Sequence, residues 1–309
     1  MSVRIIQGLM RSLSLSDEEL YDLILFDLEN GITKFDLADI YGNGEVESKL
    51  GRILSNHKEL RERMFIQTKC SIVKGGDTYY DLSYNHIMES VYNSIRKMNC
   101  GYLDSLLLHR PDILLDPSEI KKAFLELKEK GLVKHFGVSN FSKEAIEYLN
   151  SELDGFIEVN QIQLGLGQMR ILEEELNFNM DNDEAVSHSA GTFFYLKRKN
   201  MEIQAWSPFM VGFFNGSLFD EGRYPNINHK LNELANKYQK PKSTIATKFL
   251  LMLDKNLHVV TGSMNKNHVY DSIIASTFEM DKMDWYSLYK AAGKMLPWEK
   301  GLKFQPFYS

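Results

Sequence analysis

Four ionisable side chains stand at positions where they could transfer a proton. They are Asp36, Tyr41, Lys69 and His109. Asp36 ends an apolar segment and Tyr41 follows it in the next loop, while Lys69 and His109 each end a later apolar segment. In a barrel of parallel strands, reactive groups lie at the carboxyl ends of the strands. We therefore expect these four side chains to meet in one pocket.

This set of residue types suits the reduction of a carbonyl group. A carbonyl that receives a hydride develops negative charge on oxygen and needs a proton, but a phenol with a pKa near ~10 donates reluctantly. Lys69 would stabilise the phenolate of Tyr41, and Asp36 would hold Lys69 charged and in place. His109 would orient or polarise the carbonyl oxygen. Taken singly, each residue also has an ordinary structural explanation, such as a helix cap, a packed ring, an ion pair or a buried imidazole.

The elements that must position these residues alternate along the chain. Short apolar, β-branched segments are separated by amphipathic ones, which is typical of βαβ units and a parallel sheet. The segments that we predict to be strands are Arg4–Gln7, Ile32–Leu37, Met64–Thr68, Tyr102–Leu108, Lys134–Val138, Phe156–Val159, Glu202–Trp206 and His258–Thr261. Eight parallel strands close into a barrel that is filled by its own side chains. The expected fold is a single-domain (β/α)8 barrel over residues 1–309, with a C-terminal helix.

The sequence also contains signals for helix ends and for one long loop. Ser16 with Glu19 forms a capping box, and Asp116-Pro117 opens a helix that Gly131 closes. The stretch 209–228 has glycines and aromatic residues but little periodicity, so it is predicted to be a loop after the seventh strand that borders the active site. Its aromatic side chains either line an apolar substrate pocket or pack on one another; they are Phe209, Phe213, Phe214, Phe219 and Tyr224.

Composition excludes several classes of protein. The 309 residues carry a formal charge of −6, which leaves no broad basic surface for duplex nucleic acid or an anionic membrane. The two cysteines, Cys70 and Cys100, are too few for a disulfide scaffold and are expected to be reduced thiols in the core. No apolar run reaches the ~18 residues of a membrane span. We expect a cytoplasmic protein that acts on a small molecule.

Five segments, in order along nearly the whole chain, resemble the signature segments of the aldo-keto reductases. They are Gly31–Gly42, Thr68-Lys69, Leu106–Asp112, Gly137–Phe141 and Asn160-Gln161. The resemblance is closest to bacterial aldo-keto oxidoreductases whose fourth strand ends in His-Arg-Pro-Asp. It implies NADPH-dependent reduction of an aldehyde or ketone, with Tyr41 as the acid-base residue. Lys69 and Asp36 would tune Tyr41, and His109 would orient the substrate.

The resemblance also implies a cofactor pocket, although the chain has no Gly-x-Gly-x-x-Gly fingerprint of a Rossmann site. Ser139, Asn140 and Gln161 would hold the nicotinamide carboxamide. Trp206 would stack on the nicotinamide ring, unless it simply packs in the core. The expected cofactor residues in full are Gly8, Leu9, Met10, Asp36, Ser139, Asn140, Gln161, Trp206, Ser207, Pro208, Phe209, Gly262, Ser263, Met264, Asn265, His268, Asp271 and Ser272.

The segment 261–272, which matches the family's adenosine-binding loop, departs from the family pattern. Ser263 is retained, but His268 stands where relatives generally carry an arginine, and Asn265 and Ser272 are further replacements. A neutral imidazole binds phosphate less firmly than a guanidinium, which is always charged. Lys266 is a candidate for compensation. We expect NADPH to be preferred, with NADH as the alternative cofactor.

Two other functions remain open at this point. A nicotinamide-sensing regulatory subunit predicts cofactor binding without turnover. An unrelated barrel chemistry built on Lys69 does not explain why Asp36 and Tyr41 accompany that lysine.

Asp183, Glu184 and His188 are interpreted as surface residues, so no metal site is expected. The expected partner is a small carbonyl compound, and the expected assembly is a monomer or a small homo-oligomer.

Overall fold

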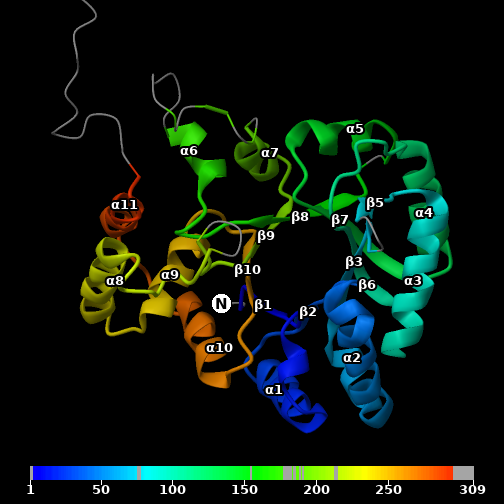
Figure 1. Ribbon diagram of the computed structural model, residues 1–309, viewed down its shortest axis with the longest axis horizontal. Coiled ribbons are helices and arrows are strands. Elements are labelled where there is room, and N and C mark those ends of the chain that lie inside the picture. Colours follow the sequence, from blue (N-terminus) through cyan, green and yellow to red (C-terminus); the bar gives the residue numbers. More distant parts are fainter. Residues whose placement is uncertain are drawn as a thin grey trace, which may run out of the picture.

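Eight parallel strands close into a barrel (Figure 1). The computed structural model describes residues 3–74, 78–153, 155–176, 183, 186, 187, 189, 191–211 and 215–294. Around the barrel the strand order is β1-β10-β9-β8-β7-β6-β3-β2. The strand bounds are β1 (Ile5–Gly8), β2 (Lys34–Asp36), β3 (Phe65–Cys70), β6 (Leu103–Leu108), β7 (Val133–Ser139), β8 (Ile157–Gln163), β9 (Glu202–Trp206) and β10 (Leu257–Thr261). The predicted (β/α)8 barrel is therefore confirmed.

The predicted strands differ from the observed ones mainly at their carboxyl ends. β3 runs on to Cys70 and β8 to Gln163, although the prediction ended them at Thr68 and Val159. Most of the added residues are polar, yet most of them are buried inside the barrel. β2 is shorter than predicted, because its paired register with β1 and β3 covers only Lys34–Asp36.

Helices cover the outside of the barrel (Figure 1). Their bounds are α1 (Asp17–Glu29), α2 (Glu45–Asn56), α3 (Tyr84–Met98), α4 (Pro117–Glu129), α5 (Lys143–Leu153), α6 (Arg170–Leu176), α7 (Thr192–Arg198), α8 (Pro225–Tyr238), α9 (Lys242–Leu251), α10 (Lys266–Ile273) and α11 (Lys282–Ala291). In the part of the chain that the structure describes, no helix is long and apolar enough to cross a membrane.

Two predicted helix signals are confirmed. Ser16 Oγ accepts a hydrogen bond from the backbone N–H of Glu19 at 3.1 Å, and the Glu19 carboxylate accepts one from the Ser16 N–H at 2.7 Å. Asp116 caps α4 by accepting from the Ser118 N–H at 2.8 Å. Gly131 follows α4 with φ +67°, a conformation that disfavours a side chain.

Two connections differ from the predicted pattern. After β3 the chain forms a short antiparallel pair, β4 (Ile72–Val73) with β5 (Tyr79–Tyr80), which the sequence did not indicate. The loop after β9 ends earlier than predicted, because α8 already begins at Pro225, where the fixed φ of proline suits a first helical turn. Phe213 and Phe214 lie outside the described residues.

Candidate active site

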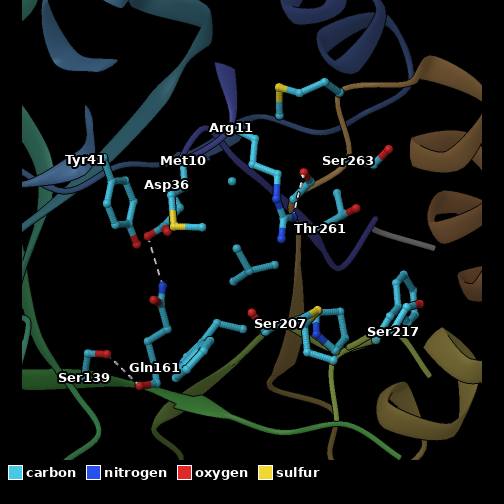
Figure 2. A pocket seen from close by; sticks show the side chains of 18 of the residues that line it. Met10, Arg11, Asp36, Tyr41, Ser139, Gln161, Ser207, Ser217, Thr261 and Ser263 are labelled. Atoms are coloured by element: carbon cyan, nitrogen blue, oxygen red, sulfur yellow. Dashed lines mark hydrogen bonds between the residues drawn. The ribbon is translucent and has the colours of Figure 1, made fainter. Parts of the chain in front are cut away.

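A cavity of about 1110 Å³ opens at the carboxyl ends of the barrel strands. Ligand pockets commonly have volumes of roughly 300–1,000 Å³, so this one has room for a large ligand. Its wall includes these predicted site residues: Gly8, Met10, Asp36, Tyr41, His109, Ser139, Asn140, Gln161, Trp206, Ser207, Pro208, Phe209, Gly262, Ser263, Met264, His268 and Asp271. Figure 2 shows Tyr41 on one side of the cavity and Ser263 on the other. The cavity therefore has a tyrosine end and a Ser263 end.

Lys69 lies behind the cavity wall and is fully buried. Its ammonium donates to Asp36 Oδ2 at 2.7 Å, to the carbonyl oxygen of Leu37 at 2.6 Å and to Tyr41 Oη at 3.3 Å. These contacts use all three protons of the ammonium. Because the oxygen of Tyr41 accepts from Lys69, its own O–H stays free to donate into the cavity.

Backbone hydrogen bonds hold Tyr41 in this place. The loop after β2 continues along β3, since Leu37 N–H donates to the Gln67 carbonyl at 2.9 Å and Asp39 N–H to the Lys69 carbonyl at 3.1 Å. The next residue, Gly42, has φ +56°, and an added Cβ there would lie 2.5 Å from Leu13 Cδ1. Glycine therefore suits the turn that points Tyr41 at Lys69 better than a residue with a side chain.

Burial and charge set the protonation of this group. Burial is the largest influence on Tyr41 and raises its pKa, while Lys69 acts in the opposite direction by favouring the phenolate. Burial also lowers the pKa of Lys69, but the charge of Asp36, with the contacts to Tyr41, outweighs it and leaves that pKa raised. The site therefore presents a protonated phenol beside a charged ammonium.

His109 completes the tyrosine end of the cavity as a neutral imidazole. Burial, followed by the positive charges of Lys69, Arg110 and Lys74, lowers its pKa to about 2. Its ring lies edge-on to the ring of Tyr41, with centroids 6.0 Å apart. A neutral imidazole has one N–H, which it can donate to a carbonyl oxygen without delivering a full charge.

Polar groups at the carboxyl ends of β7, β8 and β9 lie next to this group. Ser139 Oγ donates to the carbonyl oxygen of Gln161 at 2.9 Å, and Asn140 Nδ2 donates to Ser139 Oγ at 2.9 Å. Trp206 Nε1 donates to Asn140 Oδ1 at 3.2 Å, so its ring lies at the cavity wall and is not enclosed in the core. Asn140 and Ser207 both have positive φ, at 61° and 47°. Such strain is often stored where a ligand binds.

The polar contacts at the Ser263 end of the cavity are longer than those between Lys69 and Asp36 or Leu37. Ser263 Oγ accepts from the Asn265 N–H at 3.2 Å and lies 3.4 Å from His268 Nδ1. Asn265 caps α10 by accepting from the Asn267 N–H at 2.9 Å. Met264 and His268, on either side of this helix start, line the cavity, and a helix N-terminus favours an anion.

Some predicted residues lie away from the cavity wall. Leu9 is fully buried in the hydrophobic core, and Ser272 is buried on α10 with its hydroxyl directed at the His268 carbonyl. Asn265 caps the helix but does not line the cavity.

Of the three residues considered for a metal, Glu184 and His188 lie outside the described residues. Among those described, no group of three or more His, Cys, Asp or Glu side chains could hold a metal ion.

The sequence interpretation missed several cations at the cavity. Arg11, Lys74, Arg110 and Lys242 all line it, in a chain whose formal charge is −6. Arg11 extends beside Thr261 (Figure 2), and its guanidinium donates to the Gly262 carbonyl at 3.4 Å. A lone arginine after a strand has no signature of its own. Its place directly after Met10, an expected cofactor residue, was nevertheless a usable signal for Arg11. A cavity of this charge suits an anionic ligand.

Comparison with known proteins identifies the family. The model of the aldo/keto reductase family matches residues 4–292. The chain belongs to the aldo/keto reductase family. As a member, it is an NAD(P)H-dependent oxidoreductase. It is 30% identical over 298 residues to the uncharacterized oxidoreductase YcsN of Bacillus subtilis, covering 93% of each chain. It is 32% identical over 272 residues to a 6-dehydroglucose reductase of Agrobacterium fabrum, covering 86% of this chain and 84% of the relative.

Solved structures of aldo-keto reductases share the fold. The thermostable enzyme Tm1743, in complex with the inhibitor epalrestat, superimposes with a TM-score of 0.70 at 19% identity, over 89% of this chain and 88% of that one. The Bombyx mori aldo-keto reductase, in complex with NADP, gives a TM-score of 0.70 at 20% identity, over 93% of this chain and 88% of that one. The expected family and barrel are thus both confirmed.

Proposed function

We propose that this oxidoreductase reduces an aldehyde or ketone to an alcohol with NADPH, and that Tyr41 supplies the proton. The observation that carries the proposal is the Tyr41 hydroxyl, which faces the cavity while its oxygen accepts a hydrogen bond from the buried Lys69 ammonium. A 6-dehydroglucose reductase and a methylglyoxal reductase, both named for carbonyl substrates, are among the relatives. A bound nicotinamide would supply the hydride.

In this scheme each residue at the tyrosine end has its own role in the reduction. His109 donates its imidazole N–H to the carbonyl oxygen and places that oxygen near Tyr41. Because the pKa of Tyr41 is raised, the phenol is protonated at neutral pH and can act as an acid. When the proton leaves, the charge of Lys69 stabilises the phenolate, and Asp36 keeps that lysine charged and in place.

The residues present fit a nicotinamide dinucleotide phosphate. Asn140 and Gln161 offer amide groups at the tyrosine end, and Trp206 offers a flat ring beside them. Ser263, His268 and the start of α10 offer donors for a phosphate at the other end. We place Arg11 with this second set, because its guanidinium meets the loop that precedes α10.

A cytoplasmic location is part of the proposal. Cys70 and Cys100 are both free and buried, as expected for thiols that stay reduced. The assembly stays a prediction of a monomer or a small homo-oligomer.

The test is to measure binding and turnover in parallel. NADPH and NADH are titrated against the purified protein, and oxidation of each is followed with aromatic aldehydes, methylglyoxal and simple ketones. We expect NADPH binding and turnover on at least one carbonyl. Tight binding without turnover on any of them would favour a regulatory subunit, and absence of binding would contradict the proposal altogether.

A further inference from the structure

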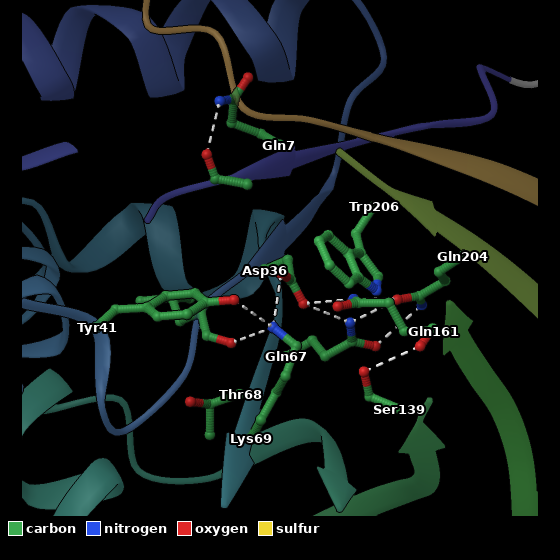
Figure 3. Close-up of polar contacts among 12 residues, drawn as sticks. Gln7, Asp36, Tyr41, Gln67, Thr68, Lys69, Ser139, Gln161, Gln204 and Trp206 are labelled. Atoms are coloured by element: carbon green, nitrogen blue, oxygen red, sulfur yellow. Dashed lines mark hydrogen bonds and ion pairs between the residues drawn. The ribbon is translucent and has the colours of Figure 1, made fainter. Parts of the chain in front are cut away.

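A closed ring of hydrogen bonds lies inside the barrel, next to the cavity (Figure 3). Asp36 Oδ1 accepts from Gln67 Nε2 at 2.7 Å and from Gln161 Nε2 at 2.9 Å. The same two nitrogens donate to Gln204 Oε1, at 2.7 Å and 2.9 Å. Both amide groups therefore use their two N–H donors within the ring.

The ring is anchored on its far side by a second carboxylate. Gln204 Nε2 donates to Gln67 Oε1 at 3.0 Å and to Glu202 Oε1 at 3.1 Å. Glu202 is paired in turn with Lys34 at 2.6 Å and lies 3.4 Å from His258 Nδ1. A chain of polar contacts thus joins Asp36 at the cavity to Glu202 at the start of β9.

The two carboxylates decide which way the amides face. A carboxylate can only accept hydrogen bonds, so Asp36 requires the nitrogens of Gln67 and Gln161, and Glu202 requires the nitrogen of Gln204. With its nitrogen committed to the ring, Gln161 has only Oε1 left. Among the described residues, none donates to that oxygen, and Gln161 lines the cavity.

We propose that Gln67, Gln204 and Glu202 are positioning residues, which keep Gln161 Oε1 turned to the cavity as an acceptor for the carboxamide N–H of the nicotinamide. The inference rests on the proposed function. None of the three lines the cavity, and Gln67 and Gln204 are only 2% and 1% exposed. They act by removing rotational freedom from Gln161 before the ligand arrives, which lowers the entropy lost on binding.

The test compares two ligands that differ only at the nicotinamide end. NADP⁺ and 2′-phospho-ADP-ribose are titrated by calorimetry against wild type and Gln204→Met, which keeps the side-chain length but removes the hydrogen bonds. We expect the affinity for NADP⁺ to fall about three- to tenfold, as for the loss of one or two net hydrogen bonds. The affinity for 2′-phospho-ADP-ribose, which lacks the nicotinamide, should be unchanged.

Two controls separate positioning from folding. Ser105→Ala removes a buried hydroxyl on the strand beside Gln67 that has no hydrogen-bond partner among the described residues, and it should leave both affinities unchanged. In a Gln161→Met background, the effect of Gln204→Met on NADP⁺ should disappear, because the residue it positions is gone. If thermal melting shows that Gln204→Met is unfolded, Gln67→Met takes its place with the same expected result.

Each outcome has a distinct meaning. Equal losses for the two ligands, or no loss for NADP⁺, would overturn the positioning role while leaving the proposed function in place. A wild-type protein that binds neither ligand would overturn the proposed function itself.

Discussion

The two ends of the cavity are built in opposite ways. At the tyrosine end, Lys69 is fully buried and all three of its ammonium protons have partners at 2.6–3.3 Å. At the other end, the side chains of Ser263, His268 and Arg11 are more exposed and meet their partners at 3.2–3.4 Å. We therefore expect the buried group to keep its arrangement and the exposed one to adapt when a ligand arrives.

In the proposed function, this difference separates two properties of the enzyme. Proton transfer depends on groups held within a few tenths of an ångström, so it needs the rigid, buried end. The choice between NADPH and NADH depends on how well exposed donors meet one phosphate, so it can change by single substitutions. Changes at the tyrosine end should therefore have large effects on turnover, and changes at the other end small effects on affinity.

The largest effect is expected from Lys69→Met. It leaves the Asp36 carboxylate without its cation, which should lower the free energy of unfolding by ~3–5 kcal/mol. In the proposed function it also removes the group that stabilises the phenolate of Tyr41, so kcat should fall by roughly 10²–10⁴-fold. Melting and steady-state rates measure the two effects.

The control for that change is Lys49→Met. Lys49 is only 5% exposed and pairs with Asp17 at 3.5 Å, but it lies away from the cavity. Its removal should lower stability and leave kcat unchanged. A similar loss of kcat in both variants would contradict the assignment of Lys69.

His109 should make stability depend on pH. Its folded pKa of about 2 is far below the unfolded value near ~6.5, so the unfolded state binds the proton first as the pH falls. The contribution is fully present above pH ~6.5 and is lost below it. Lowering the pH from ~7 to ~5 should therefore cost the wild type about 2 kcal/mol more than His109→Asn, as measured by urea unfolding. The exposed His135→Asn variant should behave as the wild type does, and identical pH curves for all three proteins would contradict the buried neutral imidazole.

A smaller effect is expected from Arg11→Met at the other end. Losing a charged donor that we propose to face a phosphate should weaken NADP⁺ binding by about tenfold, since such hydrogen bonds contribute ~1.5–3 kcal/mol and exposure reduces this. The kcat at saturating cofactor should stay the same. Arg52→Met, on an exposed arginine that pairs with Asp17 at 2.8 Å, is the matched control. Unaltered affinity in Arg11→Met would remove Arg11 from the cofactor site.

The smallest change should come from His268→Arg. A guanidinium carries its charge at every working pH, so the preference for NADPH over NADH should rise by about three- to tenfold. Asn267→Arg adds the same charge one residue earlier on α10, at a side chain that does not line the cavity. An equal gain in both variants would indicate general attraction and not a contact made by residue 268.

More of the residues at the tyrosine end than at the Ser263 end could be predicted from the sequence. Asp36, Tyr41, Lys69 and His109 could be predicted because each stands at or shortly after a strand end, and the barrel brings those ends together. Arg11 was missed, because a lone exposed arginine after a strand has no signature of its own; the one available signal was its place directly after Met10. The glutamine ring was missed for another reason: Gln67 and Gln204 each look like a polar interruption of a strand, and only the closed barrel shows that they face one another.

The most direct test of the central claim is a single-turnover measurement with Tyr41→Phe. The variant is loaded with NADPH, mixed with a carbonyl that the wild type reduces, and followed by the loss of nicotinamide absorbance. We predict cofactor binding equal to that of the wild type and a rate at least ~10²-fold lower, because the ring remains and only the proton donor is gone. A rate close to that of the wild type would show that the proton comes from elsewhere and would contradict the role of Tyr41.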